Sequence, residues 1–278
     1  MRMGKISIKK NTVQETLIIP LYARKLGNEF FPHLLQDPYA DAAASRLDYD
    51  FSALDKGKHS FLWKFGALEG ILRSKDILCE MQEYVSSHPD AAIVNMGCGL
   101  DRTPLLGDNG KIKLYNIDKK DVIAIRNDVL PPIDREINIA ADLHSDSWMD
   151  RLDASCGIFL FAAGVFMYFR EEEVRRLVLR LKASFPHGCL VFDTVGKLAV
   201  KVLMKKTLEK MGITSINGIF CCNNPLHDLR WDDGINLSVR KYLTGYVDLK
   251  QEGVPPHLRG MASLFDWLFR MNICRMTW

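Results

Sequence analysis

The stretch Ala92-Ile93-Val94-Asn95-Met96-Gly97-Cys98-Gly99-Leu100-Asp101 decides which fold we expect for this chain. A short apolar run of strand length leads directly into a Gly-x-Gly turn. Because glycine has no Cβ, the backbone can turn tightly there and a ligand can approach it closely. In open α/β sheets, ligands bind beyond the carboxyl ends of the strands. The stretch therefore predicts a ligand-binding turn at the end of a strand.

More apolar runs of strand length follow this turn, at residues 113–117, 137–141, 158–162 and 190–192. Helical patterns separate them, most clearly at residues 171–183. Apolar strands that alternate with helices predict a parallel sheet covered by helices on both faces. Residues 237–242 and 272–277 read as two later strands around a helix at 257–269. We therefore expect an α/β, Rossmann-like fold with a mostly parallel central sheet and an antiparallel C-terminal strand.

The first 88 residues have a different, helical character. Apolar residues recur at helical spacing over residues 12–26, where Pro20 interrupts the pattern. A helix is expected after Asp37-Pro38, and a long one over residues 59–86. We expect residues 1–88 to form an N-terminal helical cap and substrate lid. Residues 89–278 would form the core, with an insert at about 197–260 that shapes the substrate pocket.

Two acidic residues follow the second and third expected strands. Asp118 lies about twenty residues beyond the glycines, the spacing at which a carboxylate meets the hydroxyls of a ribose. Asp142, with Leu143 beside it, would hold the edge of an adenine. A nicotinamide dinucleotide is the nearest alternative, but its turn needs a third glycine at position 102, where this chain has Arg102. S-adenosylmethionine (SAM) has no pyrophosphate, so the pattern favours SAM.

The composition excludes several other classes of protein. The chain has 278 residues, of which 47% are apolar, and a formal net charge of +3. This charge is too small and too evenly spread to indicate nucleic acid. We find no apolar run long enough to span a membrane, and no secretory signal. The seven cysteines are scattered, without zinc-ligand spacing, so we expect reduced thiols, no metal site and a cytoplasmic location.

Several segments carry a family resemblance, in the same order along the chain. They are 16–24 (TLIIPLYAR), 37–40 (DPYA), 48–51 (DYDF), 94–101 (VNMGCGLD), 147–148 (SW), 164–169 (GVFMYF) and 185–186 (FP). They resemble bacterial polyketide O-methyltransferases of the tetracenomycin type, which are relatives of leucine carboxyl methyltransferase. The resemblance runs from about residue 11 to residue 235. It implies a class I methyltransferase fold, SAM as the methyl donor, and a carboxyl or hydroxyl oxygen as the acceptor.

The resemblance also implies which residues hold the cofactor. Gly97 and Gly99 would line its methionine part, and Arg73 would pair with its carboxylate. Asp118 would hold the ribose, while Asp142 and Leu143 would flank the adenine. The remaining expected cofactor contacts are Cys98, as a packing residue of the turn, and Ala162 and Ala163, where the fourth strand ends.

The chain departs from its relatives at two places. The relatives usually have Thr before Arg after the Leu-Asp of the glycine turn, whereas this chain has Arg102-Thr103. They also usually carry Glu at the position of Ala163. This second difference leaves open an alternative function, namely a SAM-binding protein that no longer methylates or that uses the cofactor for other chemistry.

Four residues are candidates for handling the acceptor, which we expect to be a small or medium-sized anionic molecule. Arg24 could clamp an anion, because a guanidinium binds a carboxylate through two parallel hydrogen bonds. Tyr22 lies in the same segment, and Tyr168 follows the fourth strand and could orient the acceptor. His144 could act as a base for a phenol. We expect a carboxylate slightly ahead of a phenol; the oligomeric state is not determined by the sequence.

Overall fold

A computed structural model of the protein describes residues 5–8, 16–204 and 219–278. The strands are β1 (Ile6–Ser7), β2 (Leu47–Asp48), β3 (Ala92–Met96), β4 (Lys113–Asp118), β5 (Glu136–Ala140), β6 (Ile158–Ala162), β7 (Gly188–Thr194), β8 (Asn236–Lys241) and β9 (Asn272–Thr277). The α-helices are α1 (Ile18–Phe30), α2 (Pro38–Arg46), α3 (Ser52–Asp55), α4 (Phe61–Ser87), α5 (Lys120–Val129), α6 (Glu171–Ser184), α7 (Lys197–Ala199), α9 (Pro225–Asp228) and α10 (Pro256–Leu268). Shorter helical turns are η2 (Thr103–Gly107), η3 (Met149–Arg151), η4 (Phe166–Tyr168) and the π-helical η5 (Val200–Met204).

Seven strands form one sheet in the order β5-β4-β3-β6-β7-β9-β8. Neighbouring strands from β5 to β7 are parallel, and β9 is antiparallel to both β7 and β8. The chain builds outward from β3 first through β4 and β5, and then on the other side through β6 and β7. This reversal beside β3 is the topological switch point, where ligands bind in open α/β sheets. The predicted fold class is confirmed.

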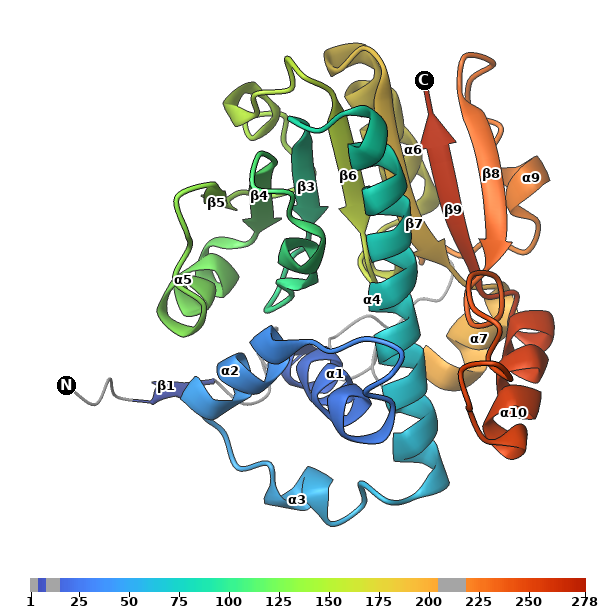
Figure 1. Ribbon diagram of the computed structural model, residues 1–278. Coiled ribbons are helices and arrows are strands. Elements are labelled where there is room, and N and C mark those ends of the chain that lie inside the picture. The colour runs from blue at the N-terminus through green and yellow to red at the C-terminus, as the bar shows by residue number, and fades with distance from the viewer. Residues whose placement is uncertain (1–4, 9–15, 205–218) are drawn as a thin grey trace.

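Helices cover both faces of this sheet, as the buried apolar strands require. On one face, α4 packs against residues of β3, β6 and β7 such as Ile93, Phe159 and Val191, and α10 packs against α4, with the rings of Phe65 and Phe265 4.6 Å apart. On the other face, α6 packs its Val174 and Leu177 against the sheet. Figure 1 shows α4 in front of the strands and α6 behind them.

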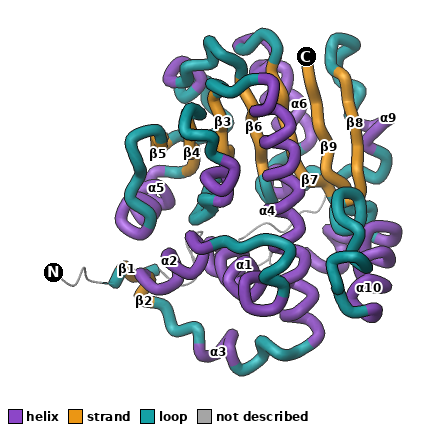
Figure 2. The backbone as a smooth tube through the Cα atoms, viewed as in Figure 1, coloured by secondary structure: helices purple, strands orange, loops and turns teal. Residues whose placement is uncertain are grey.

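The helices α1 and α2 lie beyond the carboxyl ends of the parallel strands, where they form a cap (Figures 1 and 2). Asp37 starts α2, because its side chain accepts hydrogen bonds from the amides of Tyr39 and Ala40, and Pro38 follows at the first helical position. Glycine allows α1 to cross α4 closely. A Cβ at Gly70 would lie 3.0 Å from Cβ of Ala23. The cap is thereby held against the helix that covers the sheet.

Two predicted helices differ from the structure at their ends. Pro20 does not interrupt the first helix, because α1 begins at Ile18 and Pro20 lies in its first turn, where no amide hydrogen is needed. Residues 12–15 of that prediction lie outside the described residues. The pattern of residues 197–211 predicts a second helical stretch, whose start appears as α7 and η5, and residues 205–211 lie outside the described residues. The division of the chain at residue 88 stays a prediction.

Candidate active site

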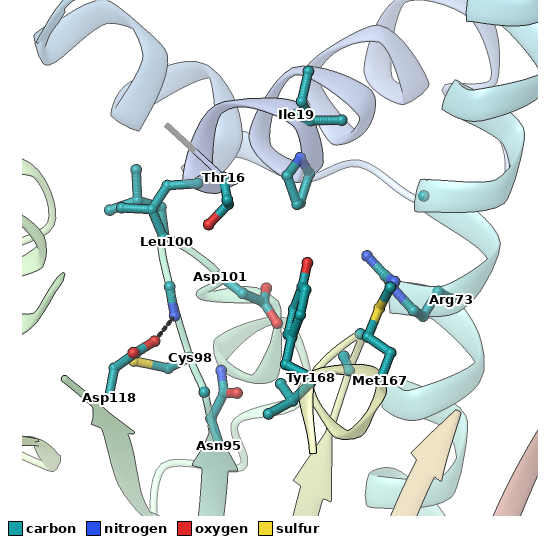
Figure 3. A pocket seen from close by; sticks show the side chains of 18 of the residues that line it. Thr16, Ile19, Arg73, Asn95, Cys98, Leu100, Asp101, Asp118, Met167 and Tyr168 are labelled. Carbon is teal, nitrogen blue, oxygen red and sulfur yellow. Dashed lines mark hydrogen bonds between the residues drawn. The ribbon is translucent and has the colours of Figure 1, made fainter. Parts of the chain in front are cut away.

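One cavity of about 640 Å³ lies between the carboxyl ends of the central strands and the cap. Its walls come from α1, from one side of α4, from the turn after β3, and from the loops that follow β4, β5 and β6. Figure 3 shows Tyr168 pointing from the loop after β6 toward α1. The cavity therefore joins both halves of the sequence at the switch point of the sheet.

The turn after β3 has the backbone shape that only glycine adopts easily. Gly97 and Gly99 have φ angles of +67° and +47°, in the left-handed region. A Cβ at Gly97 would lie 2.6 Å from a methyl carbon of Val165. The turn is fixed to the next strand by Asp118, whose carboxylate accepts from the amides of Gly99 and Lys119, each at 2.8 Å (Figure 3). Burial raises the pKa of Asp118, although these two amides oppose the shift.

The loop after β5 forms the next part of the wall, with Asp142, Leu143 and His144. The Asp142 carboxylate lies 2.9 Å from the amide of His144 and 2.7 Å from its ring Nδ1. The hydrogen bond from the amide is the main reason why the pKa of Asp142 is lowered. The imidazole also stacks on Phe169, with ring centroids 4.6 Å apart. His144 is thus held within the part of the site that we expect to receive adenine.

The opposite wall is one face of α4, which presents Arg73. Its guanidinium lies 3.8 Å from the carboxylate of Asp193, at the end of β7. A Cβ at Gly164 would lie 2.8 Å from the same guanidinium. Asp193 in turn accepts a hydrogen bond from the Gly164 amide at 2.6 Å. Arg73 is therefore placed at the carboxyl ends of β6 and β7, across the cavity from Asp118.

Asn95 and Glu69 are two of the wall residues that the sequence analysis did not single out. Asn95 is 2% exposed, and its Nδ2 has no hydrogen-bond partner among the described residues. A buried amide without a partner costs free energy unless a ligand or water satisfies it. The signal in the sequence was a polar residue within an apolar strand, next to the glycines. The second residue is Glu69, one turn before Arg73 on α4.

The structure does not bring all the expected residues to the cavity. Tyr22 is fully buried beneath the cap, where its hydroxyl donates to Asp55 at 2.6 Å. Ala162 is likewise buried and does not line the cavity. Arg24 does line it, but its guanidinium donates to Asp37 at 2.9 Å and to the carbonyl of Leu100 at 3.0 Å. These two partners occupy Nε and Nη2, so that edge of the guanidinium is not open to an anion.

Cys98 and Arg102 have structural environments that explain their presence in the turn. Cys98 is 2% exposed, and burial raises the pKa of its thiol to about 12, so it stays protonated. Arg102 points away from the turn, and its Nε donates to Glu136 at 3.0 Å. Glu136 also binds Arg126, at 3.0 Å. Position 102 thus anchors a buried ion-pair network, which accounts for an arginine there.

Comparisons with known proteins agree with this architecture. A family model for leucine carboxyl methyltransferase matches residues 23–182, more than half of the chain. This chain belongs to the leucine carboxyl methyltransferase family. It is therefore an enzyme that uses SAM as its methyl donor, and the predicted family, enzyme class and cofactor are confirmed.

Two curated relatives were found at similar identity. This methyltransferase is 28% identical over 191 residues to the tetracenomycin polyketide synthesis O-methyltransferase TcmP of Streptomyces glaucescens, with 68% of each chain covered. It is also 28% identical over 230 residues to the S-adenosyl-L-methionine-dependent methyltransferase dpfgK of Gibberella zeae, with 75% of each covered.

Solved structures share the fold at low sequence identity. A DUF574 family protein from Streptomyces avermitilis superposes with a TM-score of 0.58 at 11% identity, over 92% of this chain and 96% of that one. The plantazolicin methyltransferase BpumL, solved with a triazolic desmethylPZN analogue and SAH, gives a TM-score of 0.50 at 12% identity, over 95% of this chain and 99% of that one.

The residues of the cavity fit the donor that the family uses. Gly97 and Gly99 line the cavity without a side chain, and the unpartnered Asn95 amide offers a donor there. Asp118 presents a carboxylate at the end of β4, and Arg73 a guanidinium opposite. Across the described ranges, no three His, Cys, Asp or Glu side chains gather as metal ligands, and no helix is both long and apolar enough to span a membrane.

Proposed function

We propose that this methyltransferase transfers a methyl group to an oxygen, of a carboxylate or a phenol, on a small organic molecule. The observation that carries the proposal is the cavity in which Asp118 and the glycine turn face Arg73 and Tyr168. In this cavity, the donor would lie along the ends of the strands, and the acceptor would lie beneath the cap. The relative TcmP, an O-methyltransferase by name, supports oxygen as the acceptor atom.

Each residue would bind the part of SAM that lies nearest to it in the cavity. Asp118 would hold the ribose hydroxyls, since a carboxylate accepts strongly from a diol. Asp142 and Leu143 would flank the adenine, with the Asp142–His144 contact fixing the carboxylate. Arg73 would pair with the carboxylate of the donor. Bound SAM supplies a methyl group on a positively charged sulfur, which is activated already for displacement.

The protein must then align the acceptor and keep water out. The cap helix α1 contributes apolar residues to the cavity, including Ile19, Pro20 and Ala23. Tyr168 rises from the opposite side (Figure 3), and burial raises the pKa of its hydroxyl, so it stays a hydrogen-bond donor at neutral pH. A donor in this place would orient an acceptor oxygen without taking its proton.

A screen with methyl-labelled SAM tests the proposal. The purified protein would be incubated with panels of carboxylic acids and phenols, and label would be measured in extracted products. A base-labile product would indicate a methyl ester, whereas a base-stable product would indicate an ether. Tight SAM binding without transfer to any oxygen would contradict the proposal and favour a SAM-binding protein with other chemistry, the alternative that Ala163 raised.

A further inference from the structure

Glu69 lies on the face of α4 that forms a wall of the cavity. The residues of α4 that line it are Trp63, Gly66, Glu69, Gly70, Arg73, Ser74 and Ile77. They recur at intervals of three and four residues, so they form one stripe along the helix. Glu69 and Arg73 are therefore neighbours on the same face, separated by one turn of about 6 Å.

The position of Glu69 along α4 places it on the acceptor side of the cavity. Arg73 lies beside Gly164 and Asp193, at the ends of the strands. About one helical turn before Arg73 in α4, Gly70 packs against Ala23 of α1, and Glu69 directly precedes Gly70. The helix thus runs from the cap toward the sheet, and Glu69 lies between the cap and Arg73. This is the space left for the acceptor when the donor lies along the sheet.

The charges around this space do not favour an anionic acceptor. In the described part of the chain, the cavity is lined by Lys119, beside Asp118 at the end of β4, and by two arginines that both face carboxylates. Arg24 binds Asp37 and the Leu100 carbonyl, while Arg73 faces Asp193. Glu69 adds a further carboxylate, which would repel a second anion in a partly buried site. The pairing of Arg24 with Asp37 thus argues against an anion clamp built on Arg24.

Glu69 has the environment of a base rather than of a structural ion pair. Among the described residues, no group hydrogen-bonds to its carboxylate. Burial raises the pKa of Glu69, Arg73 opposes that shift, and Asp193 and Asp266 add to it. The neighbouring Tyr242 donates to the Glu69 backbone carbonyl at 3.4 Å and stays protonated, because burial raises its own pKa far above the usual value. A carboxylate with a raised pKa is a stronger base.

From this placement we propose that Glu69 is the general base of the reaction, and that the acceptor is a neutral hydroxyl such as a phenol rather than a carboxylate. The inference rests on the proposed function and narrows its acceptor class. Glu69 takes the proton of the acceptor O–H group. The acceptor oxygen forms its bond to the methyl carbon while the methyl–sulfur bond breaks and sulfur keeps the electron pair. Glu69 afterwards releases the proton to water.

Binding of two probes of matched shape gives a test that needs no turnover. The SAH-loaded protein would be titrated with 2-naphthol and with 2-naphthoate, in the wild-type, Glu69→Gln and Glu83→Gln forms. Glu83 is the control, an exposed glutamate on the same helix that pairs with Arg275. Glu69→Gln should raise the affinity for 2-naphthoate about tenfold, because a repelling charge is removed. Its affinity for 2-naphthol should change less than about threefold, and Glu83→Gln should change neither.

Turnover separates a base from a residue that holds the donor. Glu69→Gln should lower kcat for a weakly acidic phenol by about 10²–10⁴, the usual contribution of a general base. A nitrophenol that is already ionised at neutral pH should lose less than about tenfold, because it needs no base. The wild-type rate should rise with the ionisation of Glu69, which faces Arg73, Asp193, Asp266 and Tyr242, and the variant should instead follow the phenol's own ionisation.

The possible outcomes separate this inference from the proposed function. Wild-type methylation of phenols with an unaffected Glu69→Gln variant would overturn the inference alone. A variant that loses SAM affinity at an unchanged kcat would also overturn it, because Glu69 would then hold the donor. The inference would also be overturned if the wild-type protein bound 2-naphthoate more tightly than 2-naphthol. A wild-type protein that binds SAM but methylates no oxygen would overturn the proposed function, and the inference with it.

Discussion

The amide of Gly99 donates a hydrogen bond of 2.8 Å to the carboxylate of Asp118. One residue lies in the turn after β3 and the other at the end of β4, and the two strands pair in register from Ala92 with Lys113 to Met96 with Ile117. The bond sets the position of the carboxylate relative to the glycine turn. A ligand held by the turn thus finds the carboxylate at a fixed place.

Asp118→Asn should weaken the binding of SAH by roughly tenfold to a hundredfold. The variant keeps the shape of the side chain but loses one of its two hydrogen bonds from backbone amides and the charge that strengthens hydrogen bonds to ribose hydroxyls, worth about 1.5–3 kcal/mol. Calorimetric titration would measure the change. Asp121→Asn, an exposed substitution in the first turn of α5, is the control. Equal affinities of the two variants would place Asp118 outside the cofactor site.

Arg73→Met should separate two ligands that differ in one carboxylate. We expect SAM to lose about tenfold to a hundredfold in affinity, because a charge-assisted pair disappears. The ligand 5′-methylthioadenosine, which lacks the carboxylate, should lose less than about threefold. Lys75→Met, at the next position but one of the same helix, should leave both affinities unchanged, since Lys75 pairs with Glu252. Parallel losses for SAM and 5′-methylthioadenosine would rule out the proposed pairing.

Arg24→Met should destabilise the fold rather than alter the selectivity for the acceptor. Asp37 is 0% exposed, so the substitution leaves a buried carboxylate without its cation. Breaking such a pair costs about 3–5 kcal/mol. Urea denaturation would measure the loss. Lys58→Met, which removes an exposed pair with Glu29, should cost less than about 1 kcal/mol. An unchanged urea midpoint in Arg24→Met would disprove the structural role.

Glu173 should make the stability of the fold depend on pH in the acid range. The Arg170 side chain and amide lower the pKa of Glu173 from 4.5 to about 2. A carboxyl whose pKa is lower in the folded state stabilises fully above pH 4.5, and this contribution is lost as the pH falls toward 2. We expect about 1 kcal/mol, because water partly screens the pair. Urea midpoints of Glu173→Gln should therefore fall less between pH 5 and 3 than those of Glu172→Gln.

Much of the site could be predicted from the sequence because its signals are local. A strand that runs into glycines, with Asp118 and Asp142 at the ends of the next strands, lies within fifty residues. Parallel strands bring their carboxyl ends to one edge, so the spacing alone places these residues together. The roles of Arg24 and Tyr22 could not be read this way. Each depends on a partner from another segment, namely Asp37 with the Leu100 carbonyl, and Asp55.

The sequence by itself determined the sheet, the glycine turn and the family. Strands and turns are predicted from the types of residues that are neighbours in the sequence, so these features needed no knowledge of distant contacts. Only the tertiary structure decided which charges face the cavity. It bound Arg24 to Asp37 within the cap, and it placed Glu69 on the wall of the cavity next to the cap. Helix spacing shows that Glu69 and Arg73 share a face, but not what that face meets. That depends on how α4 lies between cap and sheet, which residues far apart in the chain decide together.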